Sequence, residues 1–371
     1  MVRKGIEKMA KNKNLNNAQK AKKDEFYTQL SDIENELGHY KEHFKGKTVL
    51  CNCDDPRVSN FFRYFALNFE FLGLKRLITT CYKNQERDLF SQNKSERAIW
   101  LEYTGDKNGN GVPDPEEIGI NHLKGDGDFR SDECIKLLEQ ADIVVTNPPF
   151  SLFREYIGQL IQYDKKFLII GSLNAVKYKE VFPLIKDNRI WLGYGFNGGN
   201  AFFKTPNPRE FSPGVYNEKT GLVKFRNVNW YTNLDHQKRH EELILYKTYN
   251  PEEYPKFDNY DAINVDETVD IPKDYPGVMG VPISFIDKYC PEQFEIVGCA
   301  QAPFNDMRIK VYPRQIQVNK DGSESLVTKL NDHPAIELKN GEKTDTYYVV
   351  DGKRYRAIYA RILIRHRRLS K

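Results

Sequence analysis

The stretch ADIVVTNPPFSLF, Ala141–Phe153, decides the fold. A run of apolar and β-branched residues ends abruptly at an asparagine, two prolines and a phenylalanine. Short uninterrupted apolar runs are typical of strands that are buried on both faces of a parallel sheet. The prolines cannot continue the strand pairing because they lack an N–H group. The stretch therefore predicts a buried strand whose carboxyl end carries a rigid corner.

Strands and helices alternate along the chain on both sides of this stretch. Further apolar runs predict strands at 47–54, 74–82, 97–105, 166–173 and 189–196. Amphipathic runs predict helices at 24–44, 58–73, 131–141, 151–164 and 177–187. Ser131 is the expected N-cap of one helix and Gly73 the expected C-cap of another. This order predicts an α/β fold with a doubly wound, mostly parallel, Rossmann-like sheet.

The pattern changes after residue 197. Two later apolar runs, 222–234 and 241–249, predict that the sheet ends in an antiparallel hairpin. Helical periodicity then disappears, and a domain boundary is expected near residue 250. Beyond it, a small β-rich C-terminal module is predicted from strands at 294–300, 346–352 and 353–365.

Composition limits the class of protein. The 371 residues include 22 Tyr and 22 Phe, which indicates a folded chain. No apolar run reaches the ~18 residues that a membrane helix needs, and the basic N-terminus lacks the apolar core of a secretory signal, so a cytoplasmic protein is expected. No C-x-x-C pair is present, and the six cysteines are interpreted as reduced thiols rather than a zinc site: Cys51, Cys53, Cys81, Cys134, Cys290 and Cys299.

Basic residues gather at both ends of the chain, although the net charge is only +4. Residues 1–23 carry eight Lys or Arg against one acid, and residues 352–371 are also strongly basic. Two basic ends would suit a polyanion such as nucleic acid. The alternative is a flexible solvating arm at 1–23 and an ordinary charged edge strand.

The corner TNPPF has the chemistry to hold a planar amino group. Asn147 offers a carbonyl acceptor, Pro148 and Pro149 fix the backbone, and Phe150 offers a ring for stacking. Acceptors for both N–H groups of an exocyclic amine would free its lone pair for attack without a strong general base. The alternative is a simple turn that follows a strand.

The form [DNS]-P-P-[FYW] after a buried strand resembles motif IV of the amino-methyltransferases. DEFYT (24–28) resembles their motif X, VLCNCDDPRVSNFF (49–62) occupies the place of motif I, and GDGDFRS (125–131) resembles motif III. With NVNWYTNL (227–234) in the place of motif VIII, the chain resembles the EcoRI-type adenine-specific DNA methyltransferases over residues 20–371.

This resemblance implies an activity. A methyltransferase domain at 24–250, with an insertion at 104–120, would transfer methyl from S-adenosylmethionine to the 6-amino group of adenine in double-stranded DNA. The base would be flipped into the NPPF pocket, and 251–371 would be the target-recognition and DNA-binding region. A role in restriction–modification, or as an orphan modification enzyme, and action as a monomer are expected.

The resemblance also assigns residues to roles. The catalytic residues would be Asn147, Pro148, Pro149 and Phe150. The cofactor-binding residues would be Phe26, Tyr27, Thr28, Asn52, Asp54, Asp128 and Phe129. Trp230 and Tyr231 are candidates to hold the flipped base, with hydrophobic core as the alternative. The catalytic site is expected to hold no metal.

The chain departs from the family pattern in motif I, whose usual glycines are missing. Asn52, Asp54 and Asp55 stand in their place, and no acidic residue ends the second strand to hold the cofactor ribose. Two alternatives therefore stay open: an RNA adenine methyltransferase, and a non-catalytic nucleic-acid-binding protein on a methyltransferase fold.

A second motif, DKNGNGVPDPEE (106–117), fits the spacing of a calcium-binding loop. Its flanks resemble strands rather than the two helices of an EF-hand. A loop of hydrogen-bonded Asx turns is the alternative. A bound ion would have a structural role. The expected ligands are Asp106, Asn108, Asn110, the Val112 carbonyl, Asp114 and Glu117.

Overall fold

The structure, a computed structural model, describes residues 26–53, 59–80, 98–111, 113–114, 117–205, 214–304, 306–339 and 341–369. The chain divides into two compact units. Unit 1 is Met1–Ala175 with Ile190–His236, and unit 2 is Val176–Arg189 with Gln237–Lys371. The expected division into an arm, a methyltransferase domain and a recognition region stays a prediction.

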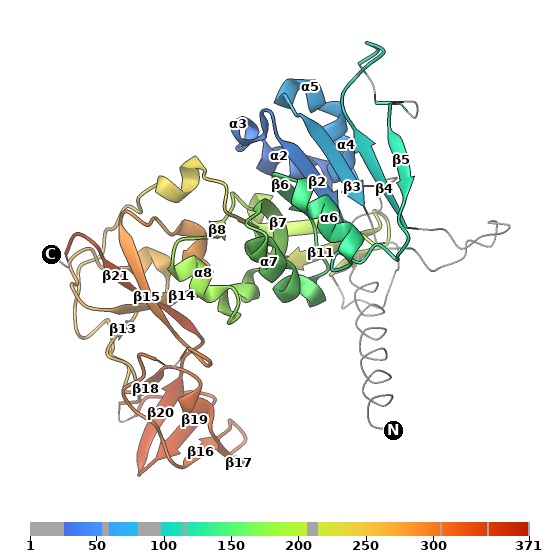
Figure 1. Ribbon diagram of the computed structural model, residues 1–371. Coiled ribbons are helices and arrows are strands. Elements are labelled where there is room, and N and C mark those ends of the chain that lie inside the picture. The colour runs from blue at the N-terminus through green and yellow to red at the C-terminus, as the bar shows by residue number, and fades with distance from the viewer. Residues whose placement is uncertain are drawn as a thin grey trace, which may run out of the picture. The chain divides into compact units, whose positions relative to one another are not determined.

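A large mixed sheet forms the centre of unit 1 (Figure 1). Its described strands, in spatial order, are β5 (Gly119–His122), β4 (Ile99–Tyr103), β3 (Arg76–Thr80), β2 (Thr48–Asn52), β6 (Ile143–Thr146), β7 (Lys166–Ser172), β12 (Val228–Thr232) and β8 (Trp191–Leu192). The four middle strands, β3, β2, β6 and β7, pair in parallel. The pairings that add β4 and β5 at one side and β12 and β8 at the other are antiparallel. Unit 1 is therefore a mixed α/β fold.

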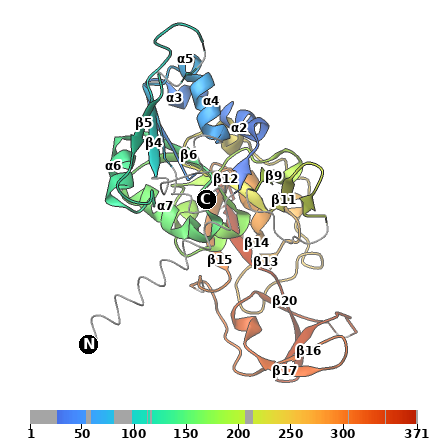
Figure 2. The ribbon, with the colours of Figure 1, turned by 90° about the vertical axis from the view of Figure 1, so that its right-hand side faces the viewer.

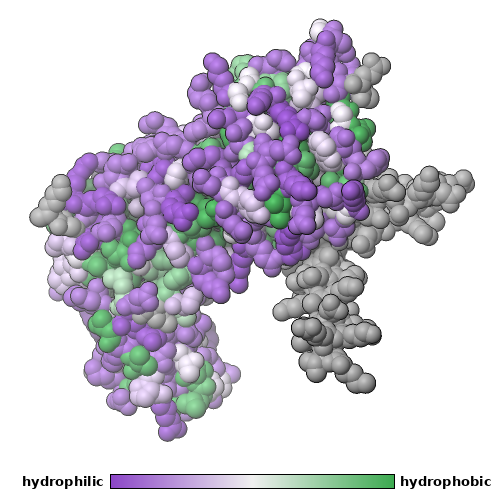
Figure 3. Space-filling view, viewed as in Figure 1, coloured by the Kyte–Doolittle hydropathy of each residue, from purple (hydrophilic) through white to green (hydrophobic). Residues whose placement is uncertain are grey.

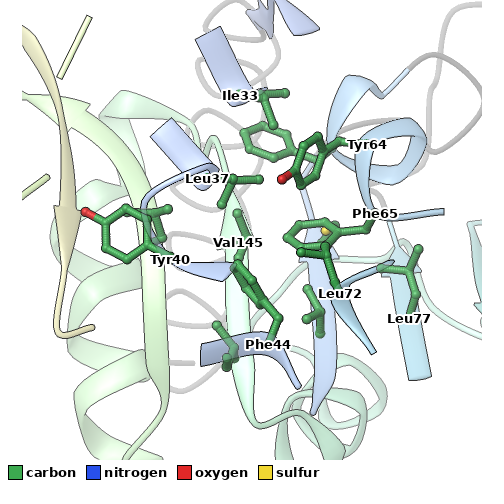
Figure 4. Packing of buried hydrophobic residues seen from close by; sticks show 14 of the residues in the cluster. Ile33, Leu37, Tyr40, Phe44, Tyr64, Phe65, Leu72, Leu77 and Val145 are labelled. Atoms are coloured by element: carbon green, nitrogen blue, oxygen red, sulfur yellow. The ribbon is translucent and has the colours of Figure 1, made fainter. Parts of the chain in front are cut away.

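Helices lie on both faces of the middle strands (Figure 2). One face carries α2 (Leu30–Leu37) and α4 (Asn60–Leu67), and the other carries α6 (Asp132–Gln140) and α7 (Phe153–Gln162). Because side chains alternate along a strand, every second residue of β2 and β6 packs into the cluster beneath α2 and α4 (Figure 4). Burial on both faces explains why the middle residues of these strands are apolar.

Two predicted helix ends are confirmed. The Ser131 hydroxyl accepts a hydrogen bond from the Cys134 N–H at 3.3 Å and caps α6. Gly73 follows α5 (Phe69–Leu72) with a φ of 60°, the left-handed conformation that a helix C-cap requires. Local capping chemistry therefore sets both ends.

The single helices predicted at 24–44 and 58–73 are wrong. The first segment contains β1 (Tyr27–Thr28), α2 and α3 (Lys41–Phe44), and α2 ends at Gly38, a residue with a low helix propensity. The second is divided at Asn68 into α4 and α5.

The predicted antiparallel hairpin at the end of the sheet is also wrong. Residues 241–249 form no strand, and β12 instead pairs between β7 and β8. The run 222–234 is divided at Asn227, whose φ is 57°. Its first half, β11 (Leu222–Arg226), joins β1, β9 (Asn200–Lys204) and β10 (Tyr216–Asn217) in a second sheet of order β1-β9-β11-β10 (Figure 2).

Unit 2 holds two sheets and a short helix, α8 (Phe182–Lys186). One sheet has the order β13 (Ile263–Asn264), β14 (Met279–Pro282), β21 (Arg361–His366), β15 (Phe294–Ala300). The other has the order β17 (Glu324–Val327), β16 (Gln315–Val318), β19 (Tyr347–Val350), β20 (Lys353–Ala357), β18 (Ala335–Glu337). The strand predicted at 294–300 is confirmed as β15, whereas the run 353–365 contributes to both sheets as β20 and β21.

Short 3-10 helices connect many of these elements: η1 (Phe150–Leu152), η2 (Leu173–Lys177), η3 (Asn197–Gly199), η4 (Gln237–His240), η5 (Thr268–Asp270), η6 (Ile283–Lys288) and η7 (Lys329–Asn331).

Hydrophilic residues predominate on the face of each unit seen in Figure 3. Among the described residues, no helix is both long enough and apolar enough to span a membrane.

Candidate active site

The corner TNPPF lies at the carboxyl end of β6, between the parallel strands β2 and β7. Asn147 and Pro148 are buried, whereas Pro149 and Phe150 are half-buried. In open parallel sheets, ligands bind beyond the carboxyl ends of the strands. The position of the corner is therefore that of a binding site.

The Asn147 side chain is held by only one of its two polar ends. Its Nδ2 group donates to the Phe26 carbonyl at 2.6 Å. Its Oδ1 atom is buried and has no hydrogen-bond partner among the described residues. A buried acceptor without a partner is costly, and a ligand that donates a hydrogen bond would remove that cost.

Phe150 lies in a cluster of aromatic rings. Its ring stacks on that of Phe26, with centroids 6.2 Å apart and an interplanar angle of 29°. Phe203 and Phe225, from the second sheet, meet Phe150 edge to face at 6.5 and 5.9 Å. The structure thus brings Phe26 and the corner together, although 121 positions separate Phe26 from Asn147.

Tyr27 and Thr28 form β1 and pair with β9. Thr28 is 1% exposed, and its carbonyl accepts from Asn60 Nδ2 at 2.7 Å. The Thr28 hydroxyl oxygen is buried without a partner among the described residues. This strand fixes the segment that precedes α2 against the start of α4.

Asn52, at the end of β2, is tied by one hydrogen bond to the corner and by another to helix α7. Its backbone carbonyl accepts from the Thr146 hydroxyl, and its Oδ1 atom accepts from the Tyr156 hydroxyl. Cys53 follows with a φ of 90°, which is uncommon for a residue other than glycine. Asp54, the other cofactor candidate of this segment, lies outside the described residues.

Asp128 forms a bidentate ion pair with Arg130. Arg130 Nε donates to one carboxylate oxygen at 2.9 Å and its terminal nitrogen to the other at 2.6 Å. Burial alone would raise the pKa of Asp128, but the hydrogen bonds and charge of Arg130 outweigh it and lower the pKa. The carboxylate is therefore kept ionised while its side chain remains 23% exposed.

Phe129 is buried at 8% exposure and meets the Tyr156 ring edge to face at 5.0 Å. Its carbonyl accepts from Gln159 at 3.0 Å, and Glu155 pairs with Arg130 at 2.7 Å. Helix α7, which follows the corner after the short helix η1, thus contacts the predicted cofactor segments at Asn52 and at 128–130.

The side chains of Trp230 and Tyr231 are both fully buried. Trp230 contacts the rings of Phe61 and Phe196, and the Tyr231 hydroxyl donates to the Ser172 carbonyl at 2.8 Å. This packing favours the alternative, hydrophobic core, and the role of holding the flipped base stays a prediction.

Close packing joins the start of α7 to β7. A Cβ atom built on Gly171 would lie only 2.4 Å from the Phe153 ring. Phe153 is 2% exposed and also contacts Tyr231 at 5.1 Å between centroids. Only glycine at position 171 lets α7 approach the sheet this closely.

The family model described as "Adenine-specific methyltransferase EcoRI" matches residues 14–367. The chain belongs to this family. It is therefore an enzyme, an adenine-specific methyltransferase, as the resemblance predicts. The match includes every described residue of the corner, of β1 and of the segment 125–131.

Three curated relatives support the assignment. The chain is 53% identical over 293 residues to the type II methyltransferase M.EcoRI of Escherichia coli. The aligned region covers 78% of this chain and 89% of the relative. It is 41% identical over 299 residues to the type II methyltransferase M.MgeORF184P of Mycoplasma genitalium, an alignment that covers 78% of this chain and 87% of the relative. It is 38% identical over 296 residues to the type II methyltransferase M.MpnI of Mycoplasma pneumoniae, with 78% of this chain and 86% of the relative covered. No solved structure matches the chain.

Sequence reasoning missed several residues that shape the site. They are Arg130, Tyr156, Phe203 and Phe225. Arg130 lies two positions after Asp128, a spacing that could have predicted the ion pair. Tyr156, Phe203 and Phe225 meet the site only through tertiary packing, and no local pattern distinguishes them.

Proposed function

We propose that this family member transfers methyl from S-adenosylmethionine to the 6-amino group of adenine in duplex DNA, within a restriction–modification system. Membership of the family supports a DNA methyltransferase of this kind. The cofactor, the flipping of the target base and the residue roles are our inference. The helices on both faces of four parallel strands further support a doubly wound, Rossmann-like arrangement.

The unpartnered Oδ1 atom of Asn147 carries the proposal. The Nδ2 bond to the Phe26 carbonyl fixes the amide, so the oxygen cannot exchange places with the nitrogen without breaking that bond. An adenine amino group would donate one hydrogen to this oxygen and the other to the Pro148 carbonyl. Both bonds favour a pyramidal nitrogen, whose lone pair can then attack.

Phe150 would stack on the flipped base. The rings of Phe26, Phe203 and Phe225 support it from behind and keep its orientation fixed. Flipping removes the base from the duplex stack, and stacking on an aromatic ring recovers part of that energy.

When bound, S-adenosylmethionine supplies an electrophilic methyl group. The residues present fit it: Asp128 is ionised and partly exposed, so it can accept from the adenine amino group of the cofactor. Asn52 ends β2 of the large sheet, and Thr28, in β1 of the second sheet, has a buried hydroxyl without a partner among the described residues. The proposed set of cofactor-binding residues also includes Phe26, Tyr27 and Phe129. Asp54, which lies outside the described residues, completes it.

We propose that unit 2 contacts the DNA. We also propose that the protein acts as a monomer and in the cytoplasm. Lys and Arg from β20 and β21 would meet phosphates, so binding should weaken as salt is raised.

The substitution Asn147→Ala tests the proposed site. We expect methyl transfer to plasmid DNA to fall by at least ~10²-fold, because the amine loses its acceptor. Cofactor affinity, measured by calorimetry, should change little. Asn35→Ala, on an exposed position of α2, is the matched control and should keep full activity. Full activity of Asn147→Ala would refute the role assigned to the corner.

A further inference from the structure

The loop between β4 and β5 is unrelated to the proposed methyl-transfer site. It spans residues 106–117, of which the structure describes 106–111, 113–114 and 117. Strands, not helices, flank it, so it is a hairpin insertion at the sheet edge (Figure 1). Gly111, sixth in the motif, has a φ of 73° and makes the sharp turn that this spacing requires.

The polar side chains of the loop turn towards one another. Asp106 accepts from the backbone N–H groups of Gly109 and Gly111, each at 2.7 Å. Asp114 Oδ2 accepts from the amide nitrogens of Asn108 at 2.5 Å and Asn110 at 3.2 Å. Rotation of these two amides would present oxygens in place of the nitrogens, at the same centre.

Glu117 provides an independent sign of a ligand. It is only 8% exposed, and its Oε1 atom accepts from the N–H groups of Lys107 at 2.5 Å and Asn108 at 3.1 Å, so the carboxylate is aimed into the loop. Its Oε2 atom is buried without a partner among the described residues. A buried carboxylate oxygen that lacks both a donor and a cation is strongly unfavourable.

Negative charge is concentrated around this atom. Asp106 and Asp114 lie in the same loop as Glu117, where Asp106 accepts from the Gly109 N–H group and Asp114 accepts from the Asn108 amide and from the Glu117 N–H group. Across the described part of the chain, neither Asp106 nor Glu117 makes an ion pair with a basic side chain. The potential at the loop therefore favours a cation.

We propose that residues 106–117 bind one calcium ion. The carboxylates alone do not suffice, since no three His, Cys, Asp or Glu residues among those described form a metal-binding group. The set also needs the amide oxygens of the loop, and an all-oxygen set suits calcium better than the smaller magnesium ion. Among the described residues, the ligands would be Asp106, Asn108, Asn110, Asp114 and Glu117.

Calcium at this loop would join the ends of β4 and β5. β5 leads directly to the segment 125–131, so the ion would stabilise the edge of unit 1 without taking part in the chemistry. Binding is therefore expected whether or not the chain transfers methyl groups, and the two proposals fail separately.

Calorimetric titration of the chelator-treated full-length chain with calcium chloride tests this site. We expect one saturable site with a dissociation constant between about 10⁻⁷ and 10⁻³ M, and weaker binding of magnesium chloride. Saturating calcium should also raise the thermal midpoint of unfolding. The absence of saturable calcium binding, or equal affinity for magnesium, would overturn the proposal.

Glu117→Gln and Asp106→Asn locate the ion. Each should weaken calcium binding by at least ~10-fold. Glu218→Gln, which removes the same charge from an exposed turn of unit 1, is the matched control and should bind calcium like the unmodified chain. Unchanged binding by Glu117→Gln would overturn the assignment, and circular dichroism of each variant separates lost binding from lost folding.

Discussion

Gly171→Ala tests whether the packing beneath the corner controls activity. The new Cβ atom would lie 2.4 Å from Cε2 and 2.7 Å from Cζ of Phe153. Ordinary carbon contacts are about 3.5–4.0 Å, so the ring must move by about 1 Å. It cannot simply swing into solvent, because Phe153 is 2% exposed.

The expected cost follows from this overlap. Overpacking of a filled core destabilises a protein by about 1–3 kcal/mol. Phe153 is the first residue of α7, three positions after Phe150, so its displacement should also move the corner. A shift of about 1 Å at a catalytic group can lower a rate by about 10²-fold. We therefore expect lower stability and a lower kcat together.

Tryptophan fluorescence provides the stability assay. The chain has three Trp residues, and all of them, Trp100, Trp191 and Trp230, lie in unit 1, so a urea titration followed by fluorescence reports on that unit. Radioactive methyl transfer to DNA gives kcat and KM for the same samples. The unfolding midpoint of Gly171→Ala should fall, with kcat affected more than KM.

Gly158→Ala is the matched control. Gly158 lies in α7, and its added Cβ would meet nothing within 4 Å. Alanine in a helix is favoured over glycine by about 0.5–1 kcal/mol, so this variant should be at least as stable as the unmodified chain. Phe153→Leu combined with Gly171→Ala should recover part of the loss. An unchanged midpoint and kcat for Gly171→Ala would refute the reasoning.

Two further predictions concern the hydrogen bonds around the site. Tyr156→Phe leaves the buried Asn52 oxygen without its hydroxyl donor and should lower the free energy of unfolding by about 1–3 kcal/mol, measured by urea titration; an unchanged midpoint would contradict this. Arg130→Gln removes the partner that lowers the pKa of Asp128. A carboxyl group with a lowered pKa stabilises the fold above its ordinary pKa of about 4, and that stability is lost as the pH falls through the lowered value. The variant should therefore lose thermal stability at a higher pH than the unmodified chain. Superimposable curves of unfolding midpoint against pH for the two proteins would contradict this prediction.

The middle of the sheet could be predicted because its signals are local. Apolar runs predict β2, β6 and β7, and capping residues predict the ends at Ser131 and Gly73. The residue types of the corner likewise follow from the chain alone. What the sequence could not provide is the partner of Asn147, since the Phe26 carbonyl lies 121 positions away.

Strand pairing was the weakest part of the prediction. The apolar run within 241–249 resembles a strand, but Ile244 and Tyr246 are each 76% exposed. A segment forms a strand only when it can pair with another strand and pack against a core, and a short stretch of sequence shows neither. The break at Asn227 depends on a left-handed backbone that asparagine tolerates but does not demand.

The path of the chain between the two units limits how unit 2 could be exchanged among relatives. Residues Val176–Arg189 belong to unit 2, although unit 1 continues on both sides of them. Within unit 2, α8 contacts β15, and the ring of Phe182 lies 4.7 Å from that of Phe304. A chimera joined at one point near residue 237 would therefore combine α8 of one parent with β15 of another. Recombination that keeps unit 2 intact requires three crossovers, so this architecture favours the inheritance of both units together.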